Sequence, residues 1–198
     1  MKQIGLQAKT KRKFKQTTDS KHGRFVAPCL LDKNFIPMKT DVAWVSDITY
    51  VSTAEGWLYV AVVLDLYSRR VVGLSMSDRI KRHLVIDAFY QAILRRHPLA
   101  GVIAHSDRGS QYASGDYQAL LKKYGAKCSM AKSCYENANM ESFFHTLKTE
   151  LVYHSSFENR RQAMQSIFEY IEVFYNNQRS HSSLGYSSPR DFEVAHSS

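Results

Sequence analysis

The sequence predicts an α/β fold: a mixed sheet in which three antiparallel strands come first and helices then alternate with further strands. Two observations predict this class. Three β-rich segments on short connections precede any helical pattern, which indicates an antiparallel meander rather than simple βαβ winding. Beyond them, helical and strand-like hydrophobic periods alternate, which adds helices and more strands to the same sheet.

The first half of the chain contains the three consecutive strands. Residues 44–51 alternate and are rich in β-branched and aromatic side chains. After a turn at Glu55-Gly56, residues 57–65 form a continuous apolar run typical of a buried central strand. Another turn at residues 67–70 leads to the third predicted strand, residues 71–76.

In the second half of the chain, predicted helices and strands alternate. Helical spacing begins at Leu84 and ends near Pro98, and a helix N-cap followed by proline at Ser188-Pro189 predicts the start of a last helix. Between them we predict a strand at 101–104, a helix at 117–124, a strand at 126–130, a helix at 137–151, and a long helix whose core face is Ala163, Ile167, Ile171 and Phe174.

Positive charge is concentrated at the start of the chain. Residues 1–40 hold ten Lys or Arg against two Asp, a net charge of +8, whereas residues 41–198 hold seventeen Lys or Arg against sixteen acids, a net +1. We therefore expect a basic arm at 1–40 before a core domain at 41–198. Such an arm suits DNA, because neutralised phosphates release counterions. A solvated tail that keeps the protein soluble is the alternative.

Other bulk features exclude several classes of protein. The longest nearly uninterrupted apolar run, residues 57–64, is far too short to cross a membrane, and the first residues lack the apolar stretch of an export signal. The three cysteines, Cys29, Cys128 and Cys134, contain no CxxC pair. We therefore expect a cytoplasmic protein with reduced thiols and no zinc site.

Three acidic residues have positions that call for a reason. Asp47 lies inside a predicted strand, where Asp is disfavoured, Asp107 just past the fourth strand in HSDRGSQY, and Glu141 in the first turns of helix 137–151. A buried carboxylate is costly unless it is paired or binds a metal. Asp107 could instead form a turn, since Asp, Gly and Ser favour turns. Asp65, at the end of the second strand, has an equal claim from spacing alone.

Five segments, in order, resemble a known family. WVSDITYV, EGWLYVAVVLDLYSRRVVG, HSDRGSQY, CYENANMESFFHTLK and YNNQRSHSSLGYSSP are similar to the catalytic half of bacterial insertion-sequence transposases. These are the transposases encoded by two overlapping reading frames, whose second product belongs to the retroviral-integrase-like superfamily. The likeness runs from about residue 1 to residue 193.

The resemblance implies a ribonuclease-H-like fold with extra C-terminal helices and a DDE-type polynucleotidyl transferase activity. It assigns the metal-binding catalytic triad to Asp47, Asp107 and Glu141, with Mg²⁺ or Mn²⁺, as two ions, for the cofactor. Asp65 falls outside that triad, and we expect it to have a structural or supporting role. The implied partners are DNA at the element ends and target, other copies of the protein, and a first-frame product, with no membrane and a bacterial cytoplasmic, nucleoid-associated location.

Candidate DNA contacts follow from charge and position. Lys148 lies seven residues after Glu141 on the same helix face, and Arg108 directly follows Asp107; each could also be an ordinary solvated side chain. Arg179 and His181 could contact DNA or tie the C-terminal helices together, and the structural role is slightly favoured. The arm adds its densest charge run, Lys11, Arg12, Lys13 and Lys15.

Two departures from the family pattern leave alternatives open. Only 33 residues separate Asp107 from Glu141, where relatives commonly have 35, and the shortening falls at residues 131–133. The helix-turn-helix-like segment usual upstream is represented only by about residues 1–6. One alternative is therefore a truncated, catalytically impaired remnant or regulator that binds DNA or a partner transposase. The other is a plain ribonuclease-H-like nuclease.

Overall fold

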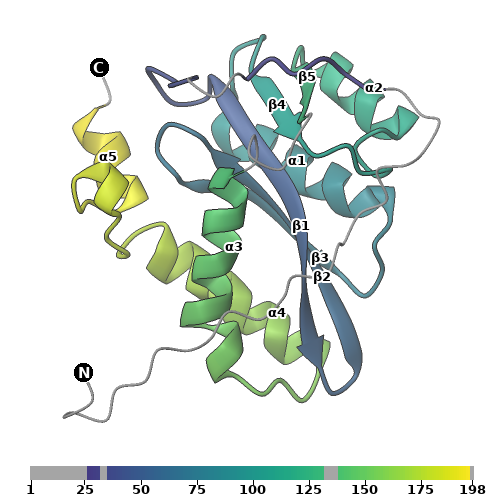
Figure 1. Cartoon of the computed structure of the whole chain (residues 1–198), viewed down its shortest axis with the longest axis vertical. Helices are drawn as coiled ribbons and strands as arrows, with labels where there is room; N and C mark the ends of the chain where they lie inside the picture. Colours follow the sequence, from purple (N-terminus) through teal and green to yellow (C-terminus); the bar gives the residue numbers. More distant parts are fainter. Residues whose placement is uncertain (1–25, 32–34, 132–137, 197–198) are drawn as a thin grey trace.

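The computed structural model describes residues 26–31, 35–131 and 138–196. A five-stranded mixed sheet lies at its centre, with the strands in the order β3-β2-β1-β4-β5 (Figure 1). The first three strands are antiparallel neighbours, as predicted, and β4 is parallel to both β1 and β5. The strands are β1 Ala43–Thr53, β2 Gly56–Asp65, β3 Val71–Ser77, β4 Ile103–Ser106 and β5 Lys127–Met130.

Helices cover both faces of this sheet. On one face α1 and α2 enclose a core that includes Trp44, Phe89 and Leu121, and on the other α3 and α4 enclose a core that includes Val45 and Leu147. Trp44 and Val45 are neighbours in β1, so the alternation of the strand feeds both cores. The helices are α1 Arg82–Arg96, α2 Gly115–Lys123, α3 Ala138–Glu150, α4 Arg160–Glu169 and α5 Pro189–Ala195, with short 3₁₀ turns at Val152–His154 and Ser182–Leu184.

A glycine allows α1 to approach the sheet closely. A Cβ atom at Gly73 of β3 would lie 2.1 Å from the carbonyl oxygen of Ala88 in α1, a distance that no real contact permits. Any larger residue would push the helix away from the strand. Gly73 therefore fixes the spacing between the first helix and the edge of the sheet.

The fourth strand lies two residues later than predicted. Sequence patterning placed it at 101–104, but β4 runs through the polar residues His105 and Ser106. Both are buried, and His105 Nδ1 lies 2.9 Å from Ser129 Oγ of β5. Because this pairing occurs between strands that are distant in sequence, hydrophobic periodicity alone could not show it.

The predicted long helix from Ala163 contains a change of pitch. After α4 the chain continues as a π-helical segment, η4 Tyr170–Tyr175, in which the amide of Asn176 donates to the carbonyl of Ile171. The wider turn moves the core position by one residue. Phe174, predicted to be a core residue, is 41% exposed, and Tyr175 is buried in its place.

The last helix begins as predicted. Ser188 is the N-cap of α5, and its hydroxyl accepts a hydrogen bond from the amide of Asp191 at 3.2 Å. Pro189 occupies the first helical position, where its missing amide proton costs nothing.

Part of the predicted arm packs on the body of the protein. Residues 26–31 run along the outer edge of β5, where the amide of Leu30 donates to Ser129 Oγ at 2.8 Å and the amide of Met130 to the carbonyl of Pro28 at 3.4 Å. Ala27 and Leu31 are buried. This segment covers the exposed edge of the sheet, which protects it from pairing with another chain.

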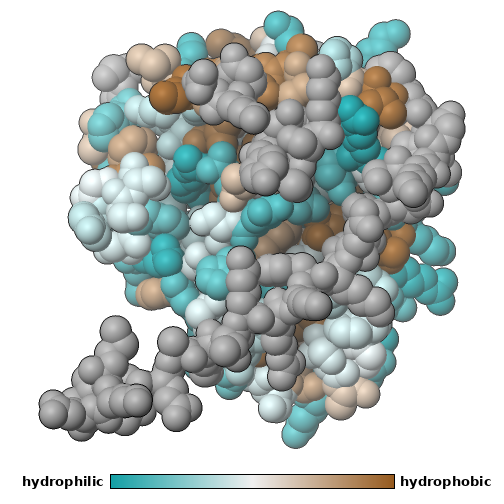
Figure 2. Space-filling model, in the orientation of Figure 1, coloured by the Kyte–Doolittle hydropathy of each residue, from teal (hydrophilic) through white to brown (hydrophobic). Residues whose placement is uncertain are grey.

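The surface is mixed in polarity. Figure 2 shows hydrophilic residues spread over one face with smaller hydrophobic areas between them. In the part of the chain that the structure describes, no helix is both long and apolar enough to cross a membrane.

Candidate functional site

Asp47 lies in the middle strand of the sheet. Strand β1 has β2 on one side and β4 on the other, and Asp47 is half-buried, with the amide of Ile48 donating to its Oδ1 at 2.7 Å. Burial, followed by the charge of Asp107 and more weakly that of Glu141, raises the pKa of Asp47 to about 8. Lys148 and the Ile48 amide act in the opposite direction. Burial and nearby negative charge thus act together on Asp47, and both disfavour its ionised form.

Asp107 follows the end of the neighbouring strand. Strands β1 and β4 are parallel, and Ser46 of β1 lies opposite Ser106 of β4. The residue that follows each of these serines along the chain is an aspartate, Asp47 or Asp107. The amide of Gly109 donates to Asp107 Oδ1 at 2.8 Å, and the amide of Tyr112 donates to the carbonyl of Gly109 at 3.0 Å. The chain therefore turns directly after Asp107, and one oxygen of this carboxylate supports the turn.

Glu141 lies on the helix that faces β1. It is exposed in the first turn of α3, and the side chain of Arg69, in the β2–β3 turn, donates to Asn139 Oδ1 at the start of the same helix. That contact joins the beginning of α3 to the sheet. Among the residues that the structure describes, no three His, Cys, Asp or Glu side chains are close enough together to form a metal-binding group. Of the other two candidate carboxylates, Asp107 raises the pKa of Asp47 more than Glu141 does.

The donor chemistry of these residues nevertheless fits a divalent cation. Carboxylate oxygens are the ligands that Mg²⁺ and Mn²⁺ prefer. Burial is the largest cause of the raised pKa of Asp47, and the repulsion from Asp107 that adds to it is the interaction that a cation between the carboxylates would reverse. The two aspartates each hold one oxygen on a backbone amide, which limits the directions in which their carboxylates point.

Lys148 also belongs to this region. It lies two turns after Glu141 on α3, is 9% exposed, and places Nζ 5.0 Å from the centre of the Tyr50 ring. Burial lowers the pKa of Lys148, while the charge of Asp47 acts to raise it. A nearly buried cation beside a carboxylate is uncommon on a solvated helix face. Arg108, next to Asp107, is half-buried.

Arg179 and His181 both make contacts within the described part of the chain. Arg179 forms a bidentate ion pair with Glu150 of α3, with Nε–Oε2 at 3.0 Å and Nη2–Oε1 at 2.7 Å. The His181 ring lies edge-on to Tyr175 at 4.9 Å, and burial, together with the charge of Arg179, lowers the pKa of His181 to about 4. Of the two roles that the sequence left open, these contacts correspond to tying the C-terminal elements together.

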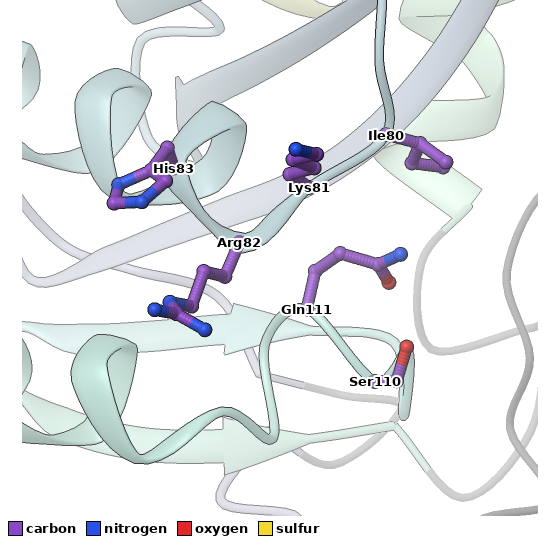
Figure 3. A pocket seen from close by; sticks show the side chains of 6 residues that line it. All are labelled: Ile80, Lys81, Arg82, His83, Ser110 and Gln111. Carbon is purple, nitrogen blue, oxygen red and sulfur yellow. The ribbon is translucent and has the colours of Figure 1, made fainter.

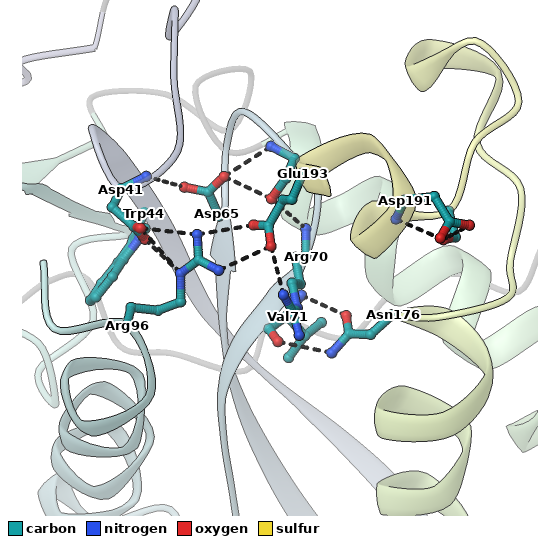
Figure 4. Close-up of polar contacts among 11 residues, drawn as sticks. Asp41, Trp44, Asp65, Arg70, Val71, Arg96, Asn176, Asp191 and Glu193 are labelled. Carbon is teal, nitrogen blue, oxygen red and sulfur yellow. Dashed lines mark hydrogen bonds and ion pairs between the residues drawn. The ribbon is translucent and has the colours of Figure 1, made fainter. Parts of the chain in front are cut away.

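Asp65 has a structural role. It is fully buried, and its carboxylate accepts hydrogen bonds from the amide of Asp41 and from both the amide and the hydroxyl of Ser68. Figure 4 shows this carboxylate within a polar cluster that joins the sheet edge, α1 and α5. In that cluster Arg96 contacts Asp41 and Glu193, and Arg70 contacts Glu193 at 2.6 Å.

A pocket of about 440 Å³ lies beside the loop that follows Asp107. Figure 3 shows Lys81, Arg82 and His83, at the start of α1, across the pocket from the loop residues Ser110 and Gln111. Arg82 is paired with Asp116 at 2.5 Å. The basic residues of this pocket were not singled out from the sequence, because the pocket forms only when two distant segments meet.

Of the other predicted site residues, Lys11, Arg12, Lys13 and Lys15 lie outside the described residues. Tyr112, in the turn after Asp107, is 1% exposed and belongs to the core on the α1/α2 face of the sheet.

Comparison with known proteins identifies the family. Residues 38–134 and 141–196 each match a family described as "Integrase core domain". The chain is 47% identical over 193 residues to an uncharacterized 31 kDa protein of insertion element IS600 from Shigella sonnei, covering 96% of this chain and 71% of that protein. It is 45% identical to the transposase of IS904 from Lactococcus lactis, over 96% of this chain and 76% of the relative. The same identity holds for the transposase InsF of IS3A from Escherichia coli, over 98% and 68%.

Solved structures show the same fold at low identity. A chain of a simian T-cell lymphotropic virus intasome superposes with a TM-score of 0.67 at 14% identity, over 89% of this chain and 60% of that one. The catalytic core domain of HTLV-2 integrase, solved with magnesium, gives a TM-score of 0.59 at 17% identity, over 79% of this chain and 98% of the core. The predicted ribonuclease-H-like fold is therefore confirmed.

Proposed function

The chain belongs to the insertion-sequence transposases that carry an integrase core domain, and from this premise we propose that it nicks and joins DNA strands during transposition in a metal-dependent reaction. The observation that supports this most directly is electrostatic. Burial and the charges of Asp107, which follows β4, and of Glu141, on the facing helix, all raise the pKa of Asp47.

Asp47, Asp107 and Glu141 would hold the metal, Mg²⁺ or Mn²⁺, as two ions. When bound, the ions would neutralise the carboxylates and stabilise the charge that develops on the phosphodiester. The protein's own residues would orient these carboxylates. In the β1–β4 register Ser46 lies opposite Ser106, the two residues that precede Asp47 and Asp107, and the amides of Ile48 and Gly109 limit how these carboxylates can turn.

The proposed chemistry has two displacements. In the first, water attacks a phosphodiester at the end of the element, the bond to the 3′ oxygen breaks, and a free 3′-hydroxyl remains. In the second, that hydroxyl attacks a phosphodiester of the target, a new P–O bond forms, and the target strand's own 3′ oxygen leaves with a proton. No covalent protein intermediate is required.

Basic side chains around the carboxylates would bind the DNA backbone. Lys148 lies close enough to affect Asp47, and Arg108 adjoins Asp107. Lys81 and His83 line the pocket beside the same loop. We assign these four residues to phosphate contacts, because Lys148, Arg108 and Lys81 are cationic and His83 adds a hydrogen-bonding ring to the same pocket. Arg179 is not included, since Glu150 already engages its guanidinium.

We also propose that the protein self-associates on DNA and acts with a first-frame product. Known relatives of the fold support the first part: one was solved as an intasome, and HTLV-2 integrase cores were solved in dimeric and trimeric forms. The first-frame product would supply sequence recognition of the element ends, which the described residues of this chain do not obviously provide.

An Asp107→Asn variant tests the function. The amide keeps the size and the turn-forming ability of the side chain but removes the charge that attracts a cation. We expect the variant to fold and to bind DNA at least as well as the parent, since repulsion toward phosphate falls. It should lose both nicking of supercoiled DNA and strand transfer with labelled element ends, and excess Mn²⁺ should restore little.

An exposed carboxylate provides the matched control. Asp87→Asn makes the same carboxylate-to-amide change at an exposed position of α1 and should leave nicking intact. If Asp107→Asn retains activity within a few fold of the parent, the metal assignment is wrong. An inactive parent would favour the remnant or regulator, and cleavage of RNA–DNA hybrids without strand transfer would favour the nuclease.

A further inference from the structure

Arg69 lies in the turn between β2 and β3 with a backbone conformation that favours glycine. Its φ is 61°, in the left-handed region, where the Cβ atom of any larger residue is crowded. The turn is closed by backbone hydrogen bonds, from the amide of Arg69 to the carbonyl of Asp65 at 2.9 Å and from the amide of Asp65 to the carbonyl of Arg70 at 2.8 Å. A glycine could make the same bonds without the crowding. An arginine kept in such a place therefore calls for a use of its side chain.

The side chain of Arg69 reaches the start of α3. Arg69 is half-buried, and Nη1 of its guanidinium donates a hydrogen bond to Oδ1 of Asn139. The turn from which the side chain extends is itself anchored, because Asp65 is fully buried and its carboxylate accepts hydrogen bonds from the amide and the hydroxyl of Ser68 at 2.9 and 2.8 Å. The contact therefore joins the beginning of a helix to a fixed point at the end of the sheet.

The helix end that this contact holds carries Glu141. Asn139 and Glu141 both lie at the start of α3, where the backbone amides have no partners within the helix and helix ends tend to fray. Met140, between them, is fully buried, but Glu141 is exposed, so its position depends on the backbone of this first turn. The turn faces the side of β1 that carries Asp47, because Val45, two residues before Asp47, packs in the same core as Met140.

We propose that Arg69 is a positioning residue, whose hydrogen bond to Asn139 holds the first turn of α3 so that Glu141 stays at the metal site. The inference rests on the proposed function, because it requires Glu141 to be a metal ligand. Residues that orient metal ligands matter nearly as much as the ligands, and losing one typically lowers metal affinity or activity by about 10–100-fold. In this role Arg69 touches neither the cation nor the DNA, so its loss acts on the site only through Glu141.

An Arg69→Gly variant of the full chain tests the proposal, because glycine keeps the turn and removes the guanidinium. Three quantities are measured: the melting temperature in EDTA, the Mn²⁺ concentration that gives half of the metal-induced rise in melting temperature, and kcat and KM for nicking. We expect the melting temperature in EDTA to stay near the parent's, since relief of the crowded backbone offsets the lost contact. The half-saturating Mn²⁺ concentration should rise about tenfold and kcat should fall about tenfold, while KM for DNA stays the same. Arg69→Lys, which has an ammonium in place of the planar guanidinium, should lie between the parent and Arg69→Gly.

A second variant removes the other side of the contact. Asn139→Ala should reproduce the loss seen in Arg69→Gly, and the double variant should be no worse than either single one, because both changes break the same hydrogen bond. Tyr186→Gly is the matched control. Tyr186 is another left-handed residue, with a φ of 64°, and it is 76% exposed, so glycine there should leave kcat and the metal response as in the parent.

The outcomes separate this role from the proposed function. If Arg69→Gly keeps the parent's kcat and metal response, or if the losses of the two single variants add in the double variant, Arg69 does not position Glu141. The proposed function stands in that case, provided that Asp107→Asn loses the metal response. A metal response that survives in Asp107→Asn, or none in the parent, overturns both.

Discussion

At the scale of single residues, Asp47 is a carboxylic acid whose surroundings disfavour its ionised form. It combines burial with the nearby charges of Asp107 and Glu141, and the favourable contacts from Ile48 and Lys148 do not compensate. A protein that keeps an acid in such a place gives up stability when no cation is present. This cost is measurable separately from catalysis.

The pH dependence of stability in EDTA should reveal that cost. The pKa of Asp47 is about 8 in the folded protein and near 3.8 when unfolded, so folding favours the protonated acid. Its contribution to stability is therefore intact below about pH 4 and is lost as the pH rises through 8. The Asn variant has no such group. From pH 4 to pH 8 we expect the parent to lose stability relative to Asp47→Asn, by at most about 1.4 kcal/mol per pH unit.

Urea unfolding of both proteins across this range provides the measurement. Asp87→Asn serves as the control, because that carboxylate is exposed, and its curve should run parallel to the parent's. Adding Mg²⁺ should narrow the gap between the parent and Asp47→Asn, since the cation favours the ionised acid. If the stability curves of the parent and of Asp47→Asn stay parallel in EDTA, the pKa of Asp47 is not raised by folding.

At the scale of elements, sequence patterning predicted most of the fold because most elements obey a local rule. The three first strands follow alternation or continuous hydrophobicity, and α5 begins at the predicted Ser188-Pro189 cap. Sequence patterning failed where a contact between distant parts of the chain overrode the local pattern. β4 includes His105 because Ser129 of another strand pairs with it, and the helix after Ala163 widens at η4, which no constant period can represent.

The π-helical segment leads to a prediction that separates the two possible core positions of this helix. Tyr175 is 3% exposed and packs against Phe143 at 4.9 Å, whereas Phe174 is 41% exposed. Tyr175→Ala should therefore destabilise the protein by about 3 kcal/mol, and Phe174→Ala by only about 0.5 kcal/mol. Chemical denaturation of the two variants measures the difference. A regular α-helix with Phe174 in the core would reverse the order of the two values.

At the scale of the whole molecule, the candidate site depends on the order of the strands. Resemblance to the family pointed to Asp47, Asp107 and Glu141, but spacing alone left Asp65 equally eligible. In the structure β4 lies beside β1, so Asp107 follows the strand next to that of Asp47, while the carboxylate of Asp65 accepts hydrogen bonds from Asp41 and Ser68. Neither strand order nor the burial of Tyr112 can be read from a single sequence, because both arise from contacts across the sheet.

The beginning of the chain has two parts with different expected roles. Residues 1–25 hold eight Lys or Arg against one Asp, a net charge of +7, and include Lys11, Arg12, Lys13 and Lys15. Residues 26–31 instead cover the edge of β5 and bury Ala27 and Leu31. A deletion that ends at residue 25 should therefore act on DNA binding, and one that ends at residue 31 should also act on folding.

Two truncations test this division. Removing residues 1–25 should weaken DNA binding and flatten the dependence of affinity on salt, by about 0.9 in the log–log slope for each phosphate that the arm neutralises, without changing the melting temperature. Removing residues 1–31 should lower the melting temperature as well, because the edge of β5 would be uncovered and the packing of Ala27 and Leu31 would be lost. Replacing Lys11, Arg12, Lys13 and Lys15 with Gln in the full chain should reproduce the salt effect of the shorter deletion, which attributes it to charge. An unchanged slope in both would identify the first 25 residues as a solubilising tail.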